Sequence, residues 1–218
     1  MKTLTARRVQ VPVASSLKSK LAILLVICGP FACGKNAVID ALIASGGFTR
    51  CVSVTTRPLG EGEVNGVDYI VVTREKFIYM RDVENVFLES AEIHGNLYGT
   101  LKKDIETKLE NGESVIIHID MQGIETLKRY GSDFIRDRLL TIYLEVDLVT
   151  SIERARNRKG RSMSDTEIVR RIITRESEEE KKHICSYRIA NPNGVLEETV
   201  YMVRNIVRRR QIEIECDR

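Results

Sequence analysis

The stretch that decides the fold of this chain is Gly29-Pro30-Phe31-Ala32-Cys33-Gly34-Lys35-Asn36. It follows an apolar run over residues 21–28 that is typical of a buried strand, and a helical pattern begins at Lys35. Seven of its eight positions fit the phosphate-binding pattern G-x-x-x-x-G-K-[ST]. Glycines at both ends let backbone N–H groups point inward, and the following helix adds the positive end of its dipole. The stretch therefore predicts a P-loop for a nucleoside triphosphate, with Lys35 on its β- and γ-phosphates.

The eighth position departs from this pattern. Asn36 replaces the Ser or Thr whose hydroxyl ligates Mg²⁺. An asparagine offers a carbonyl oxygen, directly or through water, but no hydroxyl. We expect Mg²⁺ to enter with ATP, bridging the donor phosphates, and we assign no residue as a metal ligand. The sequence leaves open whether Asn36 permits efficient turnover.

The bulk composition is that of a folded chain with no signal for a nucleic-acid or membrane partner. With 218 residues and 43% hydrophobic content, it fits one α/β domain with small inserted lobes. A net charge of +3 indicates no nucleic-acid or membrane partner, and no apolar run is long enough to span a bilayer. Five scattered cysteines are typical of reduced thiols, so we expect a cytoplasmic protein. The oligomeric state stays open.

Apolar runs alternate with helical patterns, which predicts a parallel sheet with helices on both faces. Between residues 51 and 100 the runs become short and alternating, which indicates a small β-rich lobe inserted into this core. The charged run over residues 176–182 is interpreted as an exposed helix face. The expected core strands are residues 21–28, 114–119, 140–146 and 187–190. The expected helices are residues 35–45, 102–110, 123–130, 148–158, 165–182 and 196–210.

We divide the chain into a basic, disordered tail over residues 1–20, a folded domain over 21–210 and a C-terminal tail over 211–218. The inserted lobe spans about 52–100, and a short polar, basic lid spans about 154–165. The first twenty residues carry no acid. Transit peptides share this composition, so the sequence leaves open whether the tail is a targeting segment.

Three further blocks, taken with the P-loop, make the chain resemble guanylate kinases from about Leu21 to Val207. The resemblance implies a P-loop NTPase fold of three α/β/α layers, with a GMP-binding lobe and a lid. It also implies a nucleoside monophosphate kinase that converts ATP and GMP into ADP and GDP. The blocks are Ser53-Val54-Thr55-Thr56-Arg57-Pro58 with Glu63-Val64-Asn65-Gly66-Val67-Asp68-Tyr69, then residues 87–100, then Ile119-Asp120-Met121-Gln122-Gly123.

The acceptor-site residues suit a guanine nucleotide. Arg57 can hold a phosphate bidentately, and tyrosine hydroxyls can donate to its oxygens. Glu89 and Asp120 offer acceptors to the N1–H and N2–H donors of guanine, whereas adenine presents an acceptor at N1 and is rejected. By resemblance, the GMP-binding residues are Ser53, Arg57, Glu63, Tyr69, Glu89, Tyr98, Thr100 and Asp120.

The donor side carries the cations that phosphoryl transfer requires. By resemblance, ATP is bound by Gly29, Pro30, Phe31, Ala32, Cys33, Gly34, Lys35, Asn36 and Asn191. The catalytic residues are Lys35, Arg57, Arg158 and Arg171. The lid is one residue longer than the family pattern, so Arg158, Lys159 and Arg161 all remain candidates for the main lid cation.

Two departures in the acceptor half leave alternatives open. Gly60 stands where the family has a second phosphate-binding arginine, a loss of about 1.5–3 kcal/mol of acceptor binding. His118 replaces an acid, and we interpret it as a core histidine because it lies in an apolar run. The alternatives are a catalytically weakened guanylate kinase-like binding protein, or a kinase for another phosphorylated acceptor.

Overall fold

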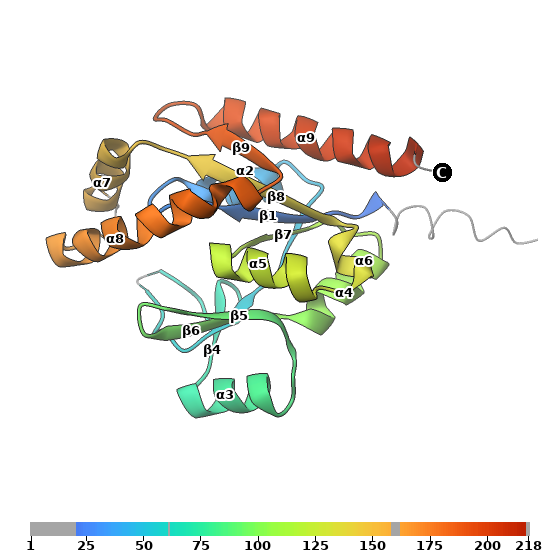
Figure 1. The fold of residues 1–218 in the computed structure, drawn as a ribbon, viewed down its shortest axis with the longest axis horizontal. Helices are drawn as coiled ribbons and strands as arrows, with labels where there is room; N and C mark the ends of the chain where they lie inside the picture. The colour runs from blue at the N-terminus through green and yellow to red at the C-terminus, as the bar shows by residue number, and fades with distance from the viewer. Residues whose placement is uncertain (1–20, 61, 158–161, 217–218) are drawn as a thin grey trace, which may run out of the picture.

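The computed structural model describes residues 21–60, 62–157 and 162–216. Its centre is a parallel sheet of five strands in the order β2-β7-β1-β8-β9 (Figure 1). The order places the first strand in the middle, so the loop that follows it emerges from the centre of the sheet. The strands are β1 (Leu24–Cys28), β2 (Thr49–Arg50), β7 (Val115–His118), β8 (Leu139–Glu145) and β9 (Tyr187–Ala190).

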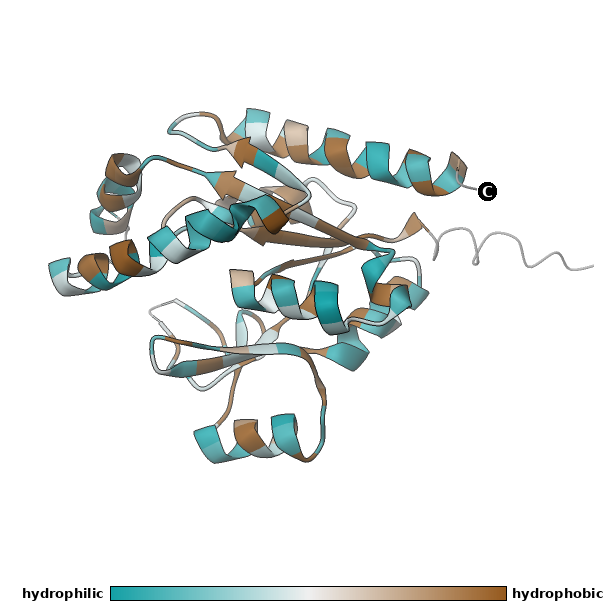
Figure 2. Cartoon of the chain, in the orientation of Figure 1, coloured by the Kyte–Doolittle hydropathy of each residue, from teal (hydrophilic) through white to brown (hydrophobic). Residues whose placement is uncertain are grey.

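The core lies on both faces of this sheet, which is why its central strands read as unbroken apolar runs. All five residues of β1 are buried. Leu25 and Ile27 pack in one cluster with α2 (Lys35–Ala44) and α9 (Leu196–Cys216). Leu24 and Val26 point the other way, and brown apolar strands lie between the two helical layers (Figure 2). The second layer contains α4 (Lys102–Glu110), α5 (Met121–Tyr130) and α6 (Asp133–Arg136).

A smaller sheet forms the inserted lobe, which lies beneath the main sheet in Figure 1. Its strand order is β4-β3-β6-β5. The lobe also contains a helix, α3 (Arg74–Asp82), that the sequence analysis did not predict. Phe77 of this helix is fully buried and stacks on Phe87 at 4.5 Å between ring centroids. The strands are β3 (Ser53–Thr55), β4 (Tyr69–Val71), β5 (Phe87–Ile93) and β6 (Asn96–Leu101).

Two helices, α7 (Leu148–Arg156) and α8 (Asp165–Lys181), border the expected lid. The α8 helix begins with a capping box in which Ser164 and Glu167 each bond the other's backbone. It ends in a short 3₁₀ turn, η1 (Lys182–Ile184), that leads into β9. The lid candidates Arg158, Lys159 and Arg161 lie outside the described residues.

The C-terminal helix is longer than expected. The sequence analysis ended this helix at residue 210, but α9 continues to Cys216. Ile214 packs against the core, and the Gln211 side chain donates to the Leu21 carbonyl at 3.0 Å. Residues 211–216 therefore belong to the folded domain. In the described part of the chain, every helix is too short or too polar to cross a membrane.

Candidate active site

The P-loop joins β1 to α2 at the carboxyl edge of the parallel sheet, where α/β folds bind ligands. Its two glycines adopt positive φ values, +137° at Gly29 and +97° at Gly34. A Cβ at Gly29 would lie 2.5 Å from the Leu144 carbonyl oxygen of β8. A Cβ at Gly34 would lie 2.5 Å from the side-chain nitrogen of Asn191. Both positions therefore require glycine for close packing as well as for backbone conformation.

Lys35 folds back over its own loop. Its Nζ donates to the Gly29 carbonyl at 2.7 Å and to the Pro30 carbonyl at 2.9 Å. Both acceptors are neutral, so a phosphate oxygen that reaches this ammonium group would make a stronger, charge-assisted bond. Asn36 is exposed at the start of α2, whereas Phe31 is buried against Ala155 and Ile168 of the lid-side helices.

Asn191 anchors the P-loop to the last strand and the last helix. Its buried amide nitrogen donates to the Cys33 carbonyl at 2.7 Å, and its amide oxygen accepts from Thr199 at 2.9 Å. Both ends of the side chain are thus occupied by protein groups. Its predicted contact with ATP stays a prediction.

Arg154 also contacts the P-loop. The sequence analysis included it only as the first residue of the lid. Its guanidinium donates to the Ala32 carbonyl at 3.4 Å and to the Asn191 carbonyl at 2.9 Å. A third bond goes to the side chain of Asn193 at 2.8 Å. Because these partners are distant in sequence, no local pattern could have indicated the contact.

Arg57, Tyr69 and Tyr98 form a cluster on the side of the lobe that faces the main sheet, and we call this cluster the Arg57 cradle. Strand pairing brings them together, since Ser53 pairs with Tyr69 and Thr55 pairs with Tyr98. The Tyr69 and Tyr98 rings meet edge to face at 6.3 Å between centroids. The Arg57 guanidinium lies 5.1 Å from the Tyr69 ring centroid.

Arg57 is held from two sides. It forms an ion pair with Glu63 at 2.8 Å and donates to the Pro58 carbonyl at 2.7 Å. Glu63 also accepts from the backbone N–H of Gly60 at 2.6 Å. A carboxylate thus fixes the arginine, and the neutral Pro58 carbonyl is the partner that a phosphate could displace.

Glu89 is the buried carboxylate of the lobe, with 6% of its surface exposed. It lies opposite Thr100 in the β5–β6 ladder and accepts from the Thr100 hydroxyl at 2.6 Å. Burial raises the pKa of Glu89 to about 7, and the charge of Asp120 adds to the rise. In the absence of a ligand that pairs with its charge, Glu89 is therefore partly protonated near neutral pH.

Asp120 meets Glu89 from the main domain. It caps α5, accepting from the Gly123 N–H at 2.8 Å, and burial raises its pKa. A Cβ at Gly123 would lie 2.8 Å from the Glu89 Oε2, so only glycine lets α5 approach this closely. The structure thus brings together the two carboxylates that the sequence analysis assigned to guanine.

The α8 helix carries Arg171 and an acid that the sequence analysis placed on an exposed face. Glu178 is half-buried. Burial and Asp120 raise the pKa of Glu178, while the charges of Lys35, Arg171 and Arg175 lower it. Glu178 therefore interacts electrostatically with Lys35 of the P-loop and with Asp120. The sequence does not distinguish Glu178 from its neighbours in the acidic run, of which Glu176 and Glu180 are exposed.

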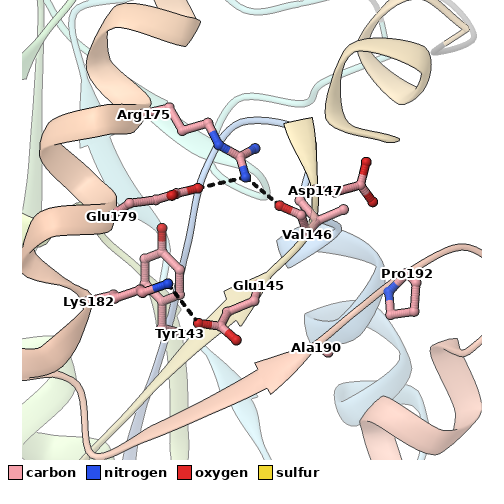
Figure 3. Close-up of a pocket in the computed structure, with 9 residues that line it drawn as sticks. All are labelled: Tyr143, Glu145, Val146, Asp147, Arg175, Glu179, Lys182, Ala190 and Pro192. Atoms are coloured by element: carbon pink, nitrogen blue, oxygen red, sulfur yellow. Dashed lines mark hydrogen bonds and ion pairs between the residues drawn. The ribbon is translucent and has the colours of Figure 1, made fainter. Parts of the chain in front are cut away.

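Arg175 clamps α8 to the end of β8, beside a cavity of about 410 Å³ between β8, β9 and α8 (Figure 3). The nearly buried guanidinium pairs with Glu179 at 2.6 Å and donates to the Val146 carbonyl and to Ser151. In the same cavity wall, the Tyr143 hydroxyl is buried with no hydrogen-bond partner among the described residues. The clamp fixes the helix that carries Arg171.

The fold and the P-loop define a nucleotide-binding α/β protein of the P-loop type, and comparison with known proteins identifies its family. The guanylate kinase family model matches residues 22–210. The guanylate kinase of Helicobacter hepaticus is 34% identical over 192 residues, covering 87% of this chain and 92% of the relative. That of Clostridium acetobutylicum is 34% identical over 191 residues, covering 87% and 86%. The chain belongs to the guanylate kinase family.

Solved structures agree with this assignment. The crystal structure of guanylate kinase from Anaplasma phagocytophilum has a TM-score of 0.68 and 28% identity, covering 87% of this chain and 86% of that one. A gluconokinase from Sinorhizobium meliloti has a TM-score of 0.50 at 14% identity, covering 90% and 98%, and shares the fold alone. The predicted fold class and family are therefore confirmed.

Proposed function

We propose that this chain transfers the terminal phosphoryl group of ATP to GMP, giving ADP and GDP. The observation that carries the proposal is the buried Glu89, whose pKa the charge of Asp120 helps to raise, on the same small sheet as the two tyrosines that contact Arg57. Two carboxylates match the two N–H groups on the guanine edge, and the cradle matches the phosphate at the other end. Membership of the guanylate kinase family supports the same reaction.

The donor phosphates would lie in the P-loop, against its backbone N–H groups and the N-terminus of α2. Lys35 would exchange the Gly29 and Pro30 carbonyls for the β- and γ-phosphates. Arg171 and a lid cation, one of Arg158, Lys159 and Arg161, would neutralise the transferring group. Catalysis then consists of positioning and charge stabilisation, and no protein base is needed because the acceptor phosphate is already an anion.

Kinases of this family generally act on ATP with a metal ion, and the residues present fit that use. The described residues contain no cluster of three His, Cys or acidic side chains that could hold a metal on their own. Asn36, exposed at the start of α2, offers one amide oxygen beside the phosphate loop. That suits Mg²⁺, which is bound largely by phosphates and water. The ion would neutralise charge on the donor phosphates.

The acceptor would span the lobe and the main sheet. Arg57, Tyr69 and Tyr98 would hold its phosphate while Glu63 keeps Arg57 oriented. Glu89 and Asp120 would accept from the guanine edge, and Ser53 and Thr100 add neutral contacts. Closing the lobe and lid would exclude water, which otherwise competes as the phosphoryl acceptor.

The test is ADP release with ATP and Mg²⁺, comparing GMP with AMP, UMP, CMP and no acceptor. We expect release that depends on GMP. Glu89→Gln should lower the preference for GMP, because a primary amide faces two donors with a single acceptor oxygen. Glu92→Gln is the matched control, since Glu92 is exposed on the same strand and pairs with Arg74 at 3.1 Å. Folded wild-type protein that releases no ADP with GMP would overturn the proposal.

A further inference from the structure

His118 does not lie in the core where its apolar neighbours suggested. It is the last residue of β7, at the carboxyl edge of the sheet, and it pairs in register with Ile27 just before the P-loop. The residue is partly exposed, and its ring meets the Tyr69 ring edge to face at 6.5 Å between centroids. The Tyr69 hydroxyl lies 3.3 Å from the His118 Nε2. The histidine of the main domain thus reaches across to the lobe.

The other neighbours of Tyr69 belong to the lobe. Arg57 lies against the face of the ring and also interacts with the hydroxyl, opposing the rise that burial causes in the pKa of Tyr69, and Tyr98 meets the ring edge to face. Contacts with a ring restrict its plane, whereas a hydrogen bond at the oxygen sets where the hydroxyl points. His118 is the contact that joins this hydroxyl to the main sheet, which also carries the P-loop.

The imidazole is neutral when it makes this contact. Burial, followed by the charges of Lys35 and Arg50, lowers the pKa of His118 to about 4. A neutral imidazole with its hydrogen on Nε2 donates to the tyrosine oxygen and leaves the tyrosine hydrogen for another acceptor. A carboxylate at this position could only accept, and would take the one hydrogen that Tyr69 has. The neutral ring also leaves the nearby cations available to an anion.

We propose that His118 is a positioning residue for the acceptor phosphate: its Nε2–H holds the Tyr69 oxygen so that the Tyr69 hydroxyl donates to the phosphate. The inference rests on the proposed function, because the acceptor is taken to be GMP. His118 acts through Tyr69 and does not itself touch the substrate. The contact links the lobe to the main sheet at the Tyr69 hydroxyl, the group that would bind the acceptor phosphate.

A double-mutant cycle tests the coupling between the two side chains. We expect His118→Ala to raise the KM for GMP by about 3- to 10-fold, the loss of one hydrogen bond, with the KM for ATP within about twofold. Tyr69→Phe should raise the KM for GMP at least as much. Adding His118→Ala to Tyr69→Phe should raise it no further, because the hydroxyl through which His118 acts is gone.

A matched pair of amides separates positioning from packing. The amide of His118→Gln reaches about as far as Nε2 and can donate to Tyr69, so we expect a KM for GMP near the wild-type value. The amide of His118→Asn is one carbon shorter, and we expect it to behave like alanine. Thermal unfolding with and without ATP shows whether each variant is folded.

The outcomes separate this inference from the function on which it rests. Wild-type protein without GMP-dependent ADP release would overturn both. An active wild type whose KM for GMP is unchanged by His118→Ala would overturn the inference alone. So would an effect of His118→Ala that persists in the Tyr69→Phe background, or equal effects of the Gln and Asn replacements.

Discussion

GMP binding should release a proton near neutral pH and weaken as the pH falls. Glu89 is 6% exposed, and burial raises its pKa to about 7. The guanine edge presents two donors, so it binds the ionised carboxylate and is repelled by the hydroxyl of the protonated acid. Binding must therefore shift Glu89 to its charged form. The linked proton leaves the protein as GMP enters.

The size of the effect follows from the pKa. At pH 6 about ten of eleven Glu89 side chains are protonated, and at pH 8 about one of eleven, so GMP affinity should fall roughly tenfold from pH 8 to pH 6. About half a proton should be released at pH 7. Calorimetry in two buffers of different ionisation enthalpy measures that release directly.

The phosphate of GMP titrates in the same range, with a pKa of about 6, and needs its own control. Glu89→Gln cannot titrate at this position, so the difference in pH dependence between wild type and this variant reports Glu89. The reasoning would be refuted by equal pH slopes in wild type and Glu89→Gln, or by calorimetry that detects no released proton in wild type at pH 7.

The same group makes the unliganded protein less stable as the pH rises. A carboxyl whose folded pKa is raised keeps its proton in the folded state after the unfolded state has lost it. Stability should therefore fall between the unfolded pKa of 4.5 and the folded value of about 7, by at most about 3 kcal/mol. Glu89→Gln should remove this decline, as denaturant unfolding at several pH values would show.

Three further substitutions test other parts of the site. Lys35→Ala should lower kcat by about 10²–10³ or more while the GMP Kd stays within twofold, because Lys35 serves the donor phosphates; unchanged turnover would contradict its role. Gly123→Ala should weaken GMP binding without changing the KM for ATP, because the new Cβ would lie 2.8 Å from Glu89, and an unaltered GMP Kd by calorimetry would show that this approach is unimportant. Tyr143→Phe should leave the free energy of unfolding unchanged or raise it by about 1 kcal/mol, because the hydroxyl is buried without a protein partner, and a loss of stability in urea would show that it is bonded.

The core strands could be predicted because a parallel sheet buried on both faces leaves continuous apolar runs. The expected strand over residues 187–190 matches β9, and the run over residues 21–28 contains β1. The α3 helix was missed because Phe77 is its only buried residue, too little to give a helical apolar period. The end of α9 was missed because its last turns pack only Ile214 against the core.

The residues of the candidate site also fall into two groups: those that a local sequence pattern predicts and those that only long-range contacts reveal. The P-loop could be predicted because glycine and lysine spacing is a local requirement of phosphate binding. Contacts made by Arg154, Glu178 and His118 could not, because each joins elements far apart in the chain. In sequence these residues read as a lid charge, a solvated face and a core position. Only the packing of helices and lobe against the sheet shows otherwise.

The contacts made without ligand indicate how substrates would displace them. Lys35 bonds two neutral carbonyls, so a doubly charged phosphate would replace both with stronger bonds. Arg57 differs, because its partners include the carboxylate of Glu63 as well as the neutral Pro58 carbonyl. A phosphate gains little by displacing a carboxylate, but gains by displacing a carbonyl. Glu63 should therefore remain bound and keep the guanidinium aimed at the acceptor, so that Glu63→Gln weakens GMP binding even though Glu63 itself is an anion.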